Sequence, residues 1–237
     1  MCVSAVGNRL STWYTGENHT KNIRGQALLQ RGLTPLNKKR NDKVDMEAAM
    51  MDREEAYKIL TKYMKGERYL QHSYAVEAIM RGLAKRLAPE QEERWGIVGL
   101  LHDLDEEQCE WQEHPEVHGP TSVEILKKEG INDQELFDAI CAHNPASGVK
   151  AHTNIQYAVL AADPMSGFLK AIAQIYPDKK ITSVKHKSVN KRFNELRFAS
   201  GANRDYMEAI EFTGLSLDEF IDISLEEMCS IADVLGL

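Results

Sequence analysis

From Asp52 onward, apolar residues recur at the three- and four-residue spacing of an α-helix, and this periodicity constrains the fold more than any other feature. Asp52 and Glu55 form a capping-box-like start for a helix over residues 54–64. Alternation of β-branched residues is scarce, and turn residues stand between the periodic segments. The sequence therefore predicts an all-α chain that folds as a single helical, bundle-like domain.

Further predicted helices cover residues 70–87, 95–104, 122–128, 133–143, 155–175 and 217–235. The segment 95–104 is apolar nearly all round, which is typical of a buried central helix. His72 and His143 each share a face with apolar residues of their own helices and are expected to point inward. Pro164 lies inside the 155–175 segment and is expected to kink or restart that helix.

Residues 1–45 differ in composition from the rest, with eight Lys and Arg against three Asp and Glu and no sustained period. We predict a flexible, basic N-terminal extension there. A weak organelle-targeting peptide is one alternative, and initiation at Met46, Met50 or Met51 is another, which we favour. The predicted helical domain then covers 46–237, with a metal core at 68–175 and a basic segment and C-terminal helices at 176–237.

The charge and apolar patterns exclude several classes of protein. A formal net charge of −7 argues against general binding of nucleic acid through a basic surface. No stretch approaches the ~20 apolar residues that span a bilayer. The four cysteines are scattered, without a C-x-x-C pair. We therefore expect a cytoplasmic protein with no membrane association.

Histidine and aspartate residues fall on the inward faces of several predicted helices, and two of them are adjacent at His102-Asp103. Burial of so many imidazoles and carboxylates is costly unless a cation compensates it. Neutral imidazole with carboxylate suits Mn, Fe, Co, Ni or Zn, and no thiolate selects zinc. The pattern predicts a metal site in the core of the bundle.

The order of these residues resembles the HD superfamily of metal-dependent phosphohydrolases. The pattern of that family is a lone His, a His-Asp pair, optional histidines and a distal Asp. In this sequence the matching residues are His72, His102, Asp103, His118, His143 and Asp163. His118 fits the register of the downstream Ser122, Ile125 and Leu126 better than His114 does, and His19, His152 and His186 have no such context.

The resemblance implies a fold and a chemistry. The six-ligand version usually holds two metal ions bridged by the Asp of the pair, which is Asp103 here. Two divalent cations can activate water and clamp a phosphoryl group for hydrolysis. Asp105 and Glu106 follow the pair and are candidate catalytic carboxylates that orient water or protonate a leaving oxygen. An acidic run exposed to solvent explains them equally well.

The segment 179–204 is mostly basic and is a candidate wall for binding substrate phosphate. Its candidate phosphate-binding residues are Lys187, Lys191, Arg192, Arg197 and Arg204. For any single one of them, a solvated helix face is the simpler explanation.

The leading hypothesis for function is a divalent-metal phosphohydrolase, acting as a phosphomonoesterase or phosphodiesterase on a small phosphorylated metabolite. A nucleotide is the family-level choice of substrate. A mixed-valent di-iron oxygenase with the same ligands is one alternative, and a non-catalytic nucleotide-sensing HD domain is another. Substrate identity, metal identity and oligomeric state stay open.

Overall fold

The structure is a computed structural model, and it describes residues 51–237. The predicted extension over residues 1–45 and the predicted domain start at residue 46 lie outside the described residues. The first described helix begins as the capping pattern predicts, because Asp52 Oδ1 accepts a hydrogen bond of 2.8 Å from the backbone N–H of Glu55.

Residues 51–237 form α-helices joined by turns and short 3₁₀ segments, with no β-strand among them, which confirms the all-α prediction. The helices are α1 (Arg53–Tyr63), α2 (Glu67–Leu87), α3 (Glu92–Leu101), α4 (Pro120–Lys128), α5 (Gln134–Ala142), α6 (Asn154–Ile175), α7 (His186–Phe193), α8 (Arg204–Glu208), α9 (Leu217–Ser230) and α10 (Ala232–Leu235). Within this range, every helix is too short or too polar to cross a lipid bilayer.

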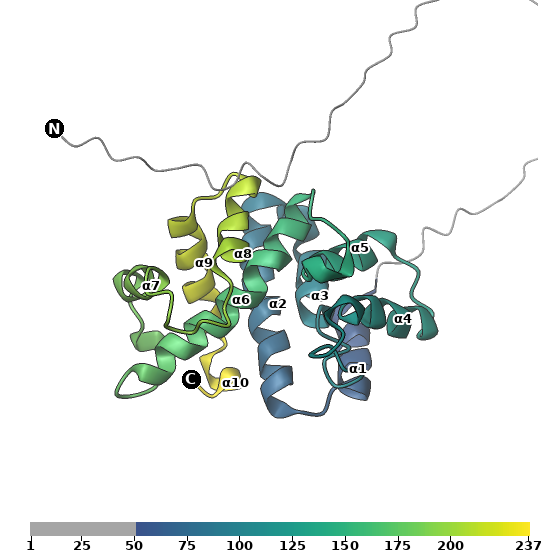
Figure 1. The fold of residues 1–237 in the computed structure, drawn as a ribbon, viewed down its shortest axis with the longest axis horizontal. Coiled ribbons are helices and arrows are strands. Elements are labelled where there is room, and N and C mark those ends of the chain that lie inside the picture. The colour runs from purple at the N-terminus through teal and green to yellow at the C-terminus, as the bar shows by residue number, and fades with distance from the viewer. Residues whose placement is uncertain (1–50) are drawn as a thin grey trace, which may run out of the picture. The chain divides into compact units, whose positions relative to one another are not determined.

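Helices α2, α3 and α6 form the centre of the bundle (Figure 1). Helix α3 is buried from Trp95 to Leu101, as its nearly all-apolar sequence predicts. Gly99 makes its close contact with α2 possible, because a Cβ there would lie 2.8 Å from Val76 O and 2.9 Å from Glu77 N. Helices α4 and α5 lie on one side of this centre, and α7 and α9 lie on the other (Figure 1).

Two helix boundaries differ from the sequence prediction: the restart expected at Pro164 does not occur, and one predicted helix is divided. Helix α6 runs without interruption from Asn154 to Ile175, although Pro164 lies inside it. Pro164 is buried with most of its neighbours, and packing of α6 against α2, α5 and α8 compensates the backbone hydrogen bond that a proline cannot donate. The single helix predicted over 217–235 is divided at Ile231, whose φ of −117° and ψ of 20° separate α9 from α10.

Candidate metal centre

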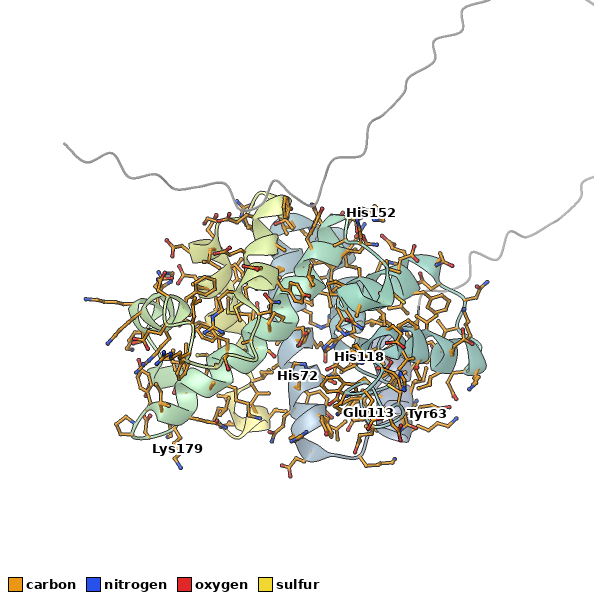
Figure 2. The ribbon with its side chains drawn as sticks, viewed as in Figure 1. Tyr63, His72, Glu113, His118, His152 and Lys179 are labelled. Atoms are coloured by element: carbon orange, nitrogen blue, oxygen red, sulfur yellow. The ribbon has the colours of Figure 1, made fainter. Side chains whose placement is uncertain are left out.

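The six predicted metal ligands converge at the centre of the bundle, although they come from four separate parts of the chain. Asp105, Cys109 and His118 have donor atoms close enough to hold an ion, and so do two groups at the centre: His72, His102, Asp103 and Asp163, and Asp103, His118 and His143. Asp103 belongs to both groups. Figure 2 shows His72 and His118 in the middle of the molecule, whereas His152 lies at its periphery.

The distances within the cluster are short on both sides of Asp103. His72 Nε2 lies 3.2 Å from His102 Nε2, and His143 Nε2 lies 2.9 Å from His118 Nε2. Asp103 Oδ2 is 3.2 Å from His72 Nε2, and its Oδ1 is 3.1 Å from His118 Nε2. Asp163 Oδ1 is 3.2 Å from His72 Nε2. All four imidazoles therefore direct Nε2 toward the carboxylates.

Backbone carbonyls fix the tautomers of two of these histidines. His102 Nδ1 lies 2.8 Å from Gly99 O, and His143 Nδ1 lies 2.5 Å from Ile140 O. A carbonyl oxygen only accepts, so Nδ1 is the protonated nitrogen in each ring. The Nε2 atom of the neutral ring then carries a lone pair that faces the cluster. This tautomer can bind a metal through Nε2.

His72 is held by a side chain instead of a carbonyl. Ser166 Oγ donates to Asp163 O at 2.9 Å, and it lies 2.9 Å from His72 Nδ1. Because the only proton of the hydroxyl is used on Asp163 O, the oxygen accepts from His72 Nδ1–H. Ser166 therefore leaves Nε2 of His72 free to face the cluster.

Asp105 supports His118 from behind. Its Oδ1 lies 2.9 Å from His118 Nδ1, although the N–H of the ring does not point at the oxygen as it does in a good hydrogen bond. Its Oδ2 accepts from Gly119 N at 2.8 Å and Ser122 N at 3.2 Å. Gly119, with φ of +90°, permits the turn that places its N–H there. Asp105 is fully buried and does not line the pocket, so the structure does not bring it to a substrate.

The electrostatics of the cluster favour positive charge at the point that the Nε2 atoms face. Burial lowers the pKa of His72, but hydrogen bonds to Asp103 and Asp163 outweigh it and raise the pKa to about 10. Burial also lowers the pKa of His118, but hydrogen bonds to Asp103 and Asp105 outweigh it and raise the pKa to about 11. Burial raises the pKa of Asp103, yet the neighbouring His102 and the other imidazoles hold it well below its usual value.

A pocket of about 520 Å³ opens onto this cluster. Its lining includes every predicted ligand except His102, together with Glu106 and Trp111. Burial and the charge of Asp103 raise the pKa of Glu106 to about 7. The indole Nε1 of Trp111 is buried and has no hydrogen-bond partner among the described residues. Of the two predicted catalytic carboxylates outside the ligand set, only Glu106 reaches the pocket.

The predicted phosphate-binding wall, residues 179–204, reaches this pocket only through Gly201. None of the five basic candidates Lys187, Lys191, Arg192, Arg197 and Arg204 lines it. The guanidinium of Arg204 donates to the carbonyls of Phe198, Ala199 and Ala202 and packs 4.3 Å from the Phe168 ring centroid. Arg192 pairs with Glu195. Figure 2 shows Lys179, where the basic segment begins, far from His72.

The cations that do line the pocket are Arg68 and Lys170, which the sequence analysis did not assign. Their positions carry a signal: Arg68 stands four residues before His72, and Lys170 stands seven after Asp163. Both spacings place residues on one helix face.

The exposed His114 contacts Glu116 and stays outside both groups of donors that contain Asp103, while His118 lies within one of them.

The donor set fits divalent metal ions, since four Nε2 lone pairs and two anionic carboxylates surround one region and every Nδ1 faces an oxygen. The all-helical bundle and this donor set together place the chain in the class of metal-binding helical proteins. A family model described as HD domain matches residues 69–180, which identifies this segment as an HD domain. Searches of curated proteins and of solved structures found no match.

Proposed function

We propose that this chain is a divalent-metal-dependent phosphohydrolase with two cations that share Asp103. The HD domain over residues 69–180 supports metal-dependent phosphohydrolase chemistry. The observation that carries the proposal of two cations is that one carboxylate belongs to both groups of donor atoms, with its two oxygens facing different imidazoles. When bound, two divalent cations supply an activated water and a clamp on the phosphoryl oxygens.

The residues of the chain perform the remaining tasks. Gly99 O, Ile140 O, Ser166 and Asp105 hold the four imidazoles with Nε2 toward the cations. Glu106 lines the same pocket, and its pKa of about 7 suits a group that exchanges a proton near neutral pH. We assign Glu106 the proton transfer with the water or the leaving oxygen, and we assign Asp105 the positioning of His118.

The finer predictions concern the substrate and the setting. A pocket of about 520 Å³ is within the range of small-molecule sites, which supports a phosphorylated metabolite of nucleotide size. A nucleotide as the substrate, the identity of the metals and a location in the cytoplasm stay predictions. The division of residues 46–237 into a metal core and a C-terminal part is likewise proposed.

The test is elemental analysis of the purified chain, followed by a phosphate-release screen with Mn, Fe, Co, Ni and Zn on a panel of phosphoesters. We expect bound divalent metal and release of phosphate from at least one ester. Two retained irons with consumption of O₂ and no phosphate release would favour the oxygenase. A metal-loaded protein that binds nucleotides and hydrolyses none of the panel would favour a sensing domain.

A further inference from the structure

Two basic side chains line the pocket beside the proposed metal ligands. Arg68 is in the first turn of α2, one turn before His72. Lys170 is on α6, two turns after Asp163. Because residues four and seven apart share a helix face, each helix presents a cation next to a member of the metal cluster.

Arg68 keeps its charge available. Its Nη2 donates to Tyr69 Oη at 2.6 Å, and its guanidinium lies 4.3 Å from the Tyr69 ring centroid. These contacts orient the group, yet it forms no ion pair with any carboxylate of residues 51–237. Most of its donors are therefore free to bind an anion in a bidentate manner.

Lys170 is held in a similar way. Its Nζ donates to Gln71 Oε1 at 3.2 Å, and within the described part of the chain it has no carboxylate partner. The arginines Arg53, Arg81 and Arg94 behave differently, because each pairs with a glutamate or aspartate. The pocket therefore contains two cations that no carboxylate of residues 51–237 neutralises.

We propose that Arg68 and Lys170 bind the phosphoryl oxygens of a dianionic phosphomonoester, so that the site selects monoesters over diesters. This inference rests on the proposed function and narrows it. Asp103, Glu106 and Asp163 are the acidic residues of the lining, and two divalent cations together with Arg68 and Lys170 exceed their charge. A dianion balances this excess better than the single charge of a diester.

The test replaces each cation by methionine, which retains the apolar stem and removes the charge. Lys128→Met and Lys150→Met are matched controls, because these lysines are exposed and lie outside the pocket. For the Mn-loaded proteins we would measure binding of inorganic phosphate by calorimetry. We would also measure kcat/KM for p-nitrophenyl phosphate and for bis-p-nitrophenyl phosphate.

We expect Arg68→Met and Lys170→Met each to weaken phosphate binding and to lower kcat/KM for the monoester by about 10-fold to 100-fold. Mn content should not change, and the control variants should behave as wild type. Two results would overturn the inference. One is phosphate affinity in both pocket variants equal to that of the wild type, and the other is a wild type whose kcat/KM is higher for the diester than for the monoester. Failure of the wild type to hydrolyse any ester would instead reject the proposed function, while the phosphate titration still decides the role of the two cations.

Discussion

Two histidine–aspartate clusters in this molecule look alike in composition and differ in what they can bind. In the central cluster, each imidazole has Nδ1 next to an oxygen and Nε2 toward shared carboxylates. At the surface, His186 Nδ1 lies 2.5 Å from Asp222 Oδ1, and its Nε2 lies 3.0 Å from Asp218 Oδ1. His186 is thus a single imidazole between two carboxylates, whereas four imidazoles converge on Asp103 in the central cluster.

The difference shows that convergence of several imidazoles on a buried carboxylate, more than the presence of His and Asp, makes a metal site. A hydrogen bond to Asp222 raises the pKa of His186, burial opposes this rise, and Asp218 adds to it. The carboxylates of the surface cluster are about 70% exposed, at 71% and 68%, whereas the Asp103 side chain is 12% exposed. Water therefore solvates the surface charges, and only the buried cluster depends on a cation for compensation.

The largest expected effect comes from removal of one carboxylate in each cluster. Asp103→Ala should remove both metal ions and lower phosphate release by at least about 100-fold. Loss of a residue that only hydrogen-bonds a metal ligand already lowers metal affinity or activity by about 10- to 100-fold. Asp218→Ala, the matched change at the surface, should alter neither. Elemental analysis and the phosphate assay measure both outcomes. Full activity in Asp103→Ala would show that the two clusters do not differ as described.

Asp105→Asn sharpens the comparison, because it changes what faces His118 Nδ1. The asparagine oxygen can keep the hydrogen bonds from Gly119 N and Ser122 N, which leaves its NH₂ toward His118. Two donors cannot face each other, so the proton of His118 should move to Nε2. We expect metal affinity at the Asp103, His118 and His143 group to fall by about 100-fold in a Mn²⁺ titration. An unchanged titration would remove the proposed positioning role of Asp105.

Ser166→Ala should have a smaller effect on the other group. It removes the acceptor of His72 Nδ1–H and leaves the ring free to turn. We expect about a 10-fold loss of Mn²⁺ affinity at the group that contains His72. Ser224→Ala is the control, because Ser224 is also buried and donates to a backbone carbonyl of its own helix. Equal behaviour of the two serine variants would contradict the account.

The smallest effect concerns the surface cluster and pH. The pKa of His186 is higher in the folded chain than its ordinary value of 6.5. Its stabilising contribution is therefore fully present below pH 6.5 and is lost as the pH rises through the folded pKa. We expect the difference in unfolding free energy between wild type and His186→Ala to be below about 1 kcal/mol at pH 6 and smaller at pH 9. A difference that grows with pH in urea denaturation would contradict the ion pair.

The sequence predicts the helices and the convergence of the cluster well, for identifiable reasons. Helix caps and apolar faces are local, so Asp52 and the buried face of α3 follow from the order of the residues. The restart expected at Pro164 does not occur, because long-range packing of α6 outweighs a local hydrogen bond. Arg204 contacts backbone carbonyls and does not line the pocket, because a run of charge does not reveal which pocket it faces.

The supporting contacts were the least predictable part of the site. Ser166 and Gly99 act through a hydroxyl and a carbonyl, and nothing in residue type alone marks them as partners of His72 and His102. Arg68 and Lys170 are single charges on helices that also carry other charges. Their importance becomes visible only when the helices are packed together around one pocket.

Anomalous scattering from crystals of the Mn-loaded chain tests the central claim most directly. The account predicts two peaks about 3.5–4 Å apart, on either side of Asp103. One should lie among His72, His102 and Asp163, and the other beside His118 and His143. A peak at His186, or no peak within bonding distance of Asp103, would contradict the account.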